Sequence, residues 1–100
     1  MNKHILTVQG YLLHPENYTK EQLEKNCDAA LAAATLAAFA ADSAYIAAYC
    51  TYCAASDAAN AAALADNDYA TLAEFWLDEY FNETGENRQD YIDTAHKDNK

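Results

Sequence analysis

An alanine-rich block from Ala29 to Ala65 constrains this chain more than any other feature, because 20 of its 37 residues are alanine. Alanine has the highest intrinsic helix propensity, since it loses no side-chain entropy when it becomes ordered. No Gly or Pro occurs between Glu16 and Thr84. The block is therefore predicted to be helical. Its small side chains would let two helix backbones pack closely, with the few large residues filling the gaps.

A single helix from Thr19 to Ala65 would be about 70 Å long, which is too long for a compact chain of 100 residues. Asp42-Ser43 can cap a new helix, and Asp66-Asn67-Asp68 can bond to its own backbone in place of the helix. We therefore predict breaks near 42–43 and 66–68. Ser56-Asp57 offers another possible cap, which leaves a kink there as an open alternative.

Several start and stop signals define the remaining helices. Thr19 followed by Gln22 fits a capping box, which starts a helix predicted over 20–41. The next helix is predicted from Ala44 toward Ala65. Residues 69–81 form the clearest amphipathic pattern, Gly85 is a natural helix stop, and a weak helix is expected over 88–96. The sequence thus predicts one all-α domain, a small bundle of three to four helices.

Residues 1–18 differ from the rest of the chain because their apolar side chains surround a glycine, Gly10. Thr7 and Val8 favour an extended backbone, and Pro15 ends the segment. A lone strand would leave backbone hydrogen-bonding groups without partners. We expect an extended or irregular N-terminal arm over the bundle, with a strand paired across a dimer or a short helix as alternatives.

The charge is strongly negative, with 16 acidic against 6 basic residues and a formal net charge of −10. Residues 66–100 alone carry 10 acids and 3 bases. Such a surface repels nucleic acid and anionic membranes but attracts basic proteins. We therefore expect a protein partner with a basic surface, and neither direct nucleic-acid binding nor membrane binding.

The N-terminus lacks the apolar core of a signal peptide, and no run of about 18 apolar residues is free of polar interruption. Three cysteines without an export signal predict reduced thiols and a cytoplasmic location. Cys50 and Cys53 form a C-x-x-C in mid-helix, without the strand-to-helix setting of redox enzymes or a second pair for zinc. No hydrolase, nucleotide or metalloprotease motif occurs. We expect a protein that is not an enzyme, with no metal and no cofactor.

A second pattern lies inside the alanine block. Tyr45, Tyr49 and Tyr52 follow an i, i+4, i+7 helical stripe, and Phe39 and Ile46 are seven residues apart. We expect these side chains to form core. The alternative is a tyrosine-lined binding surface, because tyrosine combines an apolar body with a polar tip.

The acidic end has a pattern of its own. Glu79, Glu83, Glu86, Asp90 and Asp93 step by four, three, four and three residues, so they could line one side of the molecule. The predicted partner-binding acidic face consists of these five together with Glu74 and Asp78. The aromatic residues expected to flank it are Phe75, Phe81 and Tyr91. The alternative is an acidic surface that only keeps the bundle soluble.

No motif identifies a family. In size and charge the chain is similar to small acidic helical proteins that viruses use to block host enzymes acting on nucleic acids. This similarity implies an inhibitor that binds a basic nucleic-acid-handling protein by mimicking nucleic acid, as in viral counter-defence. The alternative function is a structural or assembly module, in which close-packed alanine helices self-associate into a dimer or larger bundle.

Overall fold

The computed structural model describes residues 1–39 and 42–99, which fold into five α-helices and one short 3₁₀ turn. The elements in chain order are α1 (Lys3–Leu13), η1 (Pro15–Asn17), α2 (Lys20–Ala37), α3 (Asp42–Leu64), α4 (Asn67–Thr84) and α5 (Arg88–Asp98). The predicted all-α class is confirmed. The described part of the chain has five helices, however, instead of the three to four that we expected.

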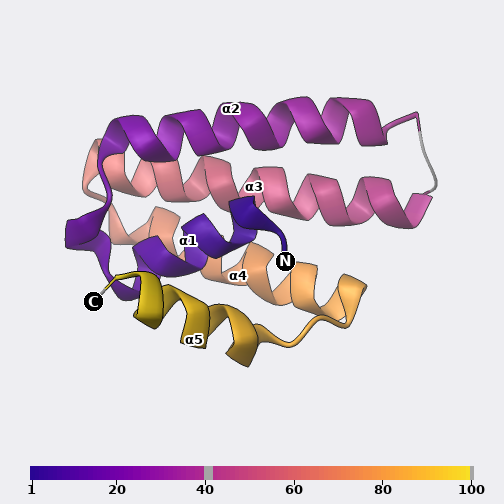
Figure 1. Cartoon of the computed structure of the whole chain (residues 1–100). Coiled ribbons are helices and arrows are strands. Elements are labelled where there is room, and N and C mark those ends of the chain that lie inside the picture. Colours follow the sequence, from indigo (N-terminus) through magenta and orange to yellow (C-terminus); the bar gives the residue numbers. More distant parts are fainter. Residues whose placement is uncertain (40–41, 100) are drawn as a thin grey trace.

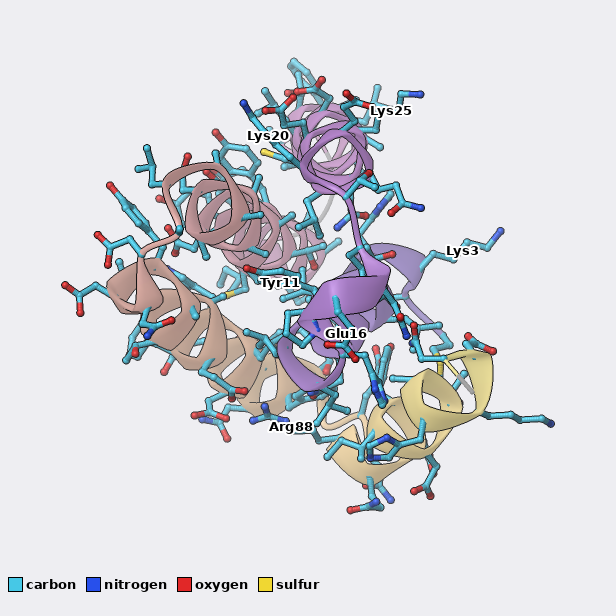
Figure 2. All side chains as sticks on the ribbon, turned by 90° about the vertical axis from the view of Figure 1, so that its left-hand side faces the viewer. Lys3, Tyr11, Glu16, Lys20, Lys25 and Arg88 are labelled. Atoms are coloured by element: carbon cyan, nitrogen blue, oxygen red, sulfur yellow. The ribbon has the colours of Figure 1, made fainter. Side chains whose placement is uncertain are left out.

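The helices form two layers (Figure 1). Helices α2, α3 and α4 lie side by side in an antiparallel row, with α3 in contact with both neighbours. Helix α1 packs on one face of this row, and α5 packs against α1. The end-on view in Figure 2 shows α2, α3 and α4 along one side of the molecule and α1 and α5 along the other. In the part of the chain that the structure describes, no helix covers the opposite face of the row.

The expected N-terminal arm is wrong, because these residues form α1 and belong to the core. The side chain of Asn2 caps α1 by accepting hydrogen bonds from two backbone N–H groups of its first turn. The backbone N–H of Asn2 donates to the Tyr91 hydroxyl at 2.8 Å, and its side-chain amide donates to Thr51 Oγ1 at 3.2 Å. Ile5 and Val8 are fully buried. Tertiary burial thus overrides the extended preference of the β-branched residues.

Gly10 allows the chain to return closely over α1. A methyl group at this buried position would overlap the hydroxyl of Tyr18, which follows η1. That hydroxyl accepts a hydrogen bond from Asn99 Nδ2 at 3.0 Å, next to the end of α5. Gly10 therefore leaves room for Tyr18, whose hydroxyl connects the segment after η1 to the end of α5.

The α2–α3 pair is built from alanine, as the composition predicts. Its buried alanines are Ala30 and Ala34 from α2, and Ala54, Ala55, Ala58, Ala59 and Ala61 from α3. The capping box is confirmed: Thr19 Oγ1 accepts from the Gln22 backbone at 3.1 Å, and Gln22 Oε1 accepts from the Thr19 backbone at 2.7 Å. Helix α3 runs through residues 56–57.

The break between α2 and α3 comes earlier than predicted. Helix α2 ends at Ala37, and α3 already begins at Asp42, two residues before the predicted start at Ala44. The predicted end of the first helix, Ala41, lies outside the described residues. The break at 66–68 is confirmed, because Ala65 has a φ of 51° and the Asp66 side chain caps α4 through the Asp68 N–H at 2.9 Å.

Helices α4 and α5 bury the sides that their patterns indicate. Ala73, Leu77 and Tyr80 are buried in α4, and Tyr91 and Ala95 in α5. Gly85 ends α4 with a φ of 70°, in the left-handed region that favours glycine. Across residues 1–39 and 42–99, every helix is too short or too polar to cross a membrane.

Candidate functional site

Two of the predicted acidic-face residues form ion pairs with Arg88 in the first turn of α5. Its Nη1 donates to Asp78 Oδ1 at 2.6 Å, and its Nη2 forms an ion pair with Glu74. Its Nε donates to Oε1, the side-chain amide oxygen of the buried Gln9, at 3.0 Å. Figure 2 shows Arg88 between the helix layers. Glu74 and Asp78 therefore belong to a cluster that joins α1, α4 and α5.

Glu86 is also engaged inside the chain, since its carboxylate accepts hydrogen bonds from two tyrosine hydroxyls. Tyr80 donates to Oε2 at 2.8 Å, and Tyr91 donates to Oε1. Burial raises the pKa of Tyr80 and Tyr91, so both hydroxyls stay protonated and available as donors at neutral pH. Glu86 thereby fixes the turn between α4 and α5.

The other four acidic-face residues are Glu79, Glu83, Asp90 and Asp93, and no ion pair in the described part of the chain involves them. Glu79 and Glu83 lie about 140° around α4 from Glu74 and Asp78. Their charges act on the thiol of Cys50 in α3. Asp90 and Asp93 are exposed on α5. The structure thus separates the seven carboxylates into different surroundings instead of placing them on one line.

The three flanking aromatic residues are also separated. Phe75 is 51% exposed, whereas Tyr91 is 2% exposed. Phe81 is half-buried between the rings of Tyr80 and Tyr91, at centroid distances of 5.3 and 5.2 Å. Of the three, only Phe75 presents a largely open ring to a partner.

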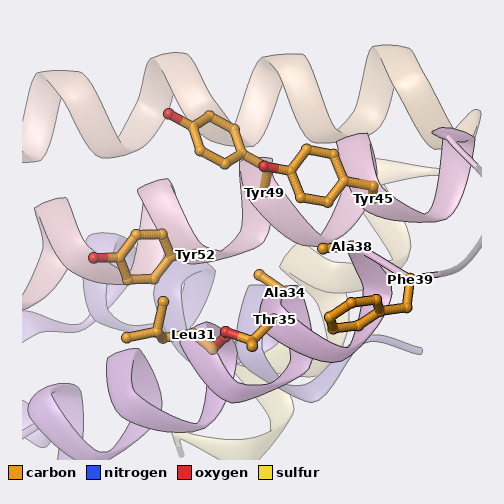
Figure 3. A pocket seen from close by; sticks show the side chains of 8 residues that line it. All are labelled: Leu31, Ala34, Thr35, Ala38, Phe39, Tyr45, Tyr49 and Tyr52. Atoms are coloured by element: carbon orange, nitrogen blue, oxygen red, sulfur yellow. The ribbon is translucent and has the colours of Figure 1, made fainter.

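The more open apolar surface lies elsewhere, in a cleft of about 340 Å³ between α2 and α3 (Figure 3). We call it the aromatic cleft. It is lined by Leu31, Ala34, Thr35, Ala38, Phe39, Tyr45, Tyr49 and Tyr52. Phe39 is 89% exposed, and Tyr45 and Tyr49 are also exposed. The expectation that this patch forms core is therefore wrong for Phe39, Tyr45, Ile46 and Tyr49, whereas Tyr52 is half-buried and packs against the core.

The cleft has a physical origin in the α2–α3 pair. Most of the buried residues of α2 and α3 are alanines, whereas Leu31, Phe39, Tyr45 and Tyr49 are exposed along the cleft. Ala34 and Ala38 are too small to fill the space between Leu31 and Phe39 on one side and the tyrosines on the other. In the sequence, the i, i+4, i+7 stripe of tyrosines was the signal for this cleft, because the tyrosines are offset around α3 from most of its buried alanines.

Neighbouring rings extend the aromatic cleft onto α4. The rings of Tyr45 and Tyr49 are stacked, with centroids 6.2 Å apart and planes at 30°. Tyr49 meets Trp76 edge-on at 6.0 Å, and Trp76 meets Phe75 edge-on at 5.1 Å. These distances are typical of favourable aromatic pairs. Four rings therefore form a continuous strip across two helices.

Most of the α2–α3–α4 row carries charge of one sign. Between Asn26 and Asn87 the sequence contains ten acidic residues and no Lys, Arg or His. The basic residues of α2, Lys20 and Lys25, lie in its N-terminal half (Figure 2) and do not line the aromatic cleft. Positive charge is thus missing from the sequence that forms most of this row.

The three cysteines of the row are free. Burial raises the pKa of Cys27, Cys50 and Cys53, which keeps their thiols protonated at neutral pH. Within the described ranges, no three His, Cys, Asp or Glu side chains come together in an arrangement that could hold a metal ion.

No protein-family model, curated protein or solved structure matches this chain. Its function is therefore inferred from the chemistry of its own surface.

Proposed function

We propose that this protein is a small acidic interaction protein that binds a protein partner with a basic surface. The observation that carries the proposal is the one-signed stretch from Asn26 to Asn87, which has ten acids and no base and forms most of the α2–α3–α4 row. A one-signed surface attracts a basic partner over distance and disfavours acidic ones. Arg88, the next base along the chain, is already bound by two carboxylates.

The partner that best fits this surface is a protein that itself handles nucleic acid. Such proteins use Lys and Arg to neutralise phosphates, so their binding surfaces are strongly basic. An acidic protein bound there would exclude the nucleic acid and so inhibit the partner. Glu83, Asp90 and Asp93 are exposed acids that support this role, and inhibition requires no regular array of charges.

A pull-down from nuclease-treated bacterial lysate tests the proposal. A basic protein should be retained at low salt and released at high salt, because salt screens charge attraction. The triple variant Glu83→Lys, Asp90→Lys and Asp93→Lys should weaken retention. Its control is Glu16→Lys, Glu21→Lys and Glu24→Lys, which changes the net charge equally and leaves every acid between Asn26 and Asn87 in place. Circular dichroism should show unchanged helix content in both.

Two results would contradict the proposal. One is retention of a partner that does not respond to salt. The other is the recovery of no basic protein at any salt concentration. Equal weakening by both triple variants would mean that the total charge, and not the acidic end, controls binding.

The uncovered apolar face of the row favours one alternative, a module that self-associates. Many of its alanines are already buried within the α2–α3 pair, so self-association would depend more on the exposed aromatic residues than on close-packed alanine. Sedimentation equilibrium at low and high salt separates the two functions, because an association driven by apolar burial persists at high salt.

A further inference from the structure

We propose that the aromatic cleft is the docking site for an amphipathic helix of the partner, with apolar side chains on one face and Lys or Arg along its edges. This inference rests on the proposed function, since it assigns the site and the form of the basic partner. The inference places the main contact with the partner on the outer face of the α2–α3–α4 row, and not on the C-terminal carboxylates Glu83, Asp90 and Asp93.

The size of the aromatic cleft fits two turns of a helix. Leu31 lies on α2 and Phe39 in the turn just after it, and Tyr45 and Tyr52 are seven residues apart on α3, which gives about 10 Å along α3 at 1.5 Å per residue. Helices that dock in grooves insert side chains at i, i+3 or i+4, and i+7, which cover the same length. The volume of about 340 Å³ is at the lower end of typical binding pockets.

The lining of the cleft is unusually exposed. Leu31, Phe39, Tyr45, Tyr49 and neighbouring Phe75 keep between 41% and 89% of their surface open. Single exposed apolar residues are ordinary, but a contiguous patch of this kind marks an interaction site. Aromatic side chains are also enriched at interfaces, where they add large contact area at low entropic cost.

Charge decides between a basic helix and a second copy of this chain. A second copy docked face to face would bring two acidic rows together without a base between residues 26 and 87 to pair with them. An exposed carboxylate, Asp28, lies one helical turn before the cleft residue Leu31 on α2. Lys or Arg on a docked helix would pair with this carboxylate and stack on the tyrosine rings.

Trp76 provides the readout for the test, because it is the only tryptophan in the chain and contacts Tyr49 of the aromatic cleft. The probes are three 18-residue peptides without Trp or Tyr. The first is an amphipathic helix of Leu and Lys, the second has the same composition in a scrambled, non-amphipathic order, and the third is amphipathic with Glu in place of Lys. We expect the first to change Trp76 fluorescence and to bind at least tenfold more tightly than the other two.

The cleft variant is Leu31→Gln with Phe39→Gln, and its control is Leu36→Gln with Leu64→Gln. All four residues are exposed apolar side chains, but the control pair lies outside the cleft lining. Both variants should therefore keep the thermal stability of the parent. We expect the cleft variant to lose the tenfold preference for the amphipathic basic peptide and the control to retain it.

The outcomes separate this inference from the proposed function. If the scrambled and amphipathic basic peptides bind equally and lose affinity in salt, the acidic interaction function stands and cleft docking is overturned. If no basic peptide binds at low salt, both are overturned. If the protein alone forms a dimer that the cleft variant abolishes, the occupant is a second copy and the inference is wrong.

Discussion

Replacing Arg88 by Met should destabilise the protein far more than removing any exposed base. Arg88 joins three helices, because it bonds to Gln9 in α1 and to Glu74 and Asp78 in α4 from its position in α5. Its guanidinium also lies 5.9 Å from the centre of the Phe81 ring. Methionine keeps much of the apolar stem but removes all of these polar contacts.

The magnitude follows from the surroundings of each contact. Gln9 is 1% exposed, so leaving its side-chain oxygen Oε1 without a donor costs about 1–3 kcal/mol. The Arg88 side chain is 28% exposed and its carboxylate partners are 45% and 64% exposed, which limits each ion pair to about 0.5 kcal/mol. The cation–π contact adds about 0.5 kcal/mol. The total is about 2.5–4.5 kcal/mol, which lowers the Tm of a chain of this size by at least roughly 10 °C.

Urea unfolding followed by circular dichroism measures this loss, with Lys20→Met as the control. Lys20 also forms an ion pair, with Glu24 at 3.8 Å, but both side chains are exposed, so its loss should cost about 0.5 kcal/mol or less. Arg88→Lys should fall between the two, since lysine keeps the charge but lacks the donor fork. Equal losses for Arg88→Met and Lys20→Met would refute the reasoning.

Three further predictions follow from other parts of the fold. Gly10→Ala should lower the free energy of unfolding by about 1 kcal/mol, because crowding against Tyr18 outweighs the better helix propensity of alanine; in a Tyr18→Ala background, urea denaturation should show a smaller loss. Burial raises the pKa of Asp57, so the folded state binds this proton more tightly than the unfolded state and the charged form costs stability at pH 7. Asp57→Asn should therefore stabilise the protein at pH 7, and denaturation at several pH values should show the gain shrinking toward about pH 4. All three thiols should react with Ellman's reagent at least tenfold more slowly at pH 7.5 than in the guanidine-unfolded chain, because burial raises their pKa and lowers the thiolate fraction.

The sequence predicted the fold wherever a local chemical signal decides the structure. The capping box at Thr19, the Asp66 cap and the left-handed Gly85 depend on residues within a few positions of one another. Helix α1 was missed because its position is set by bonds from Asn2 to residues 49 and 89 positions away. A helical stripe at 5, 8 and 12 was present, but Gly10 and the β-branched residues obscured it.

The candidate sites were harder to predict, because spacing along the chain says little about which charges are neutralised. Glu74 and Asp78 look like free surface acids until the turn at Gly85 brings α5 back and places Arg88 against them. Glu86 likewise fits a line of charge in the sequence but accepts two tyrosine hydroxyls in the fold. The acids without a partner inside the fold can be identified only once these long-range contacts are known.

The alanine content accounts for both the packing of this fold and its open surface. Most of the residues that α2 and α3 bury are alanines, whose small side chains allow close packing. Tyr45, Tyr49 and Phe39 are exposed, and Ala34 and Ala38 line the aromatic cleft beside them. The composition that makes the α2–α3 pair compact therefore also displaces its aromatic rings to the surface. A partner helix that fills the cleft would supply the large side chains that the pair itself does not provide.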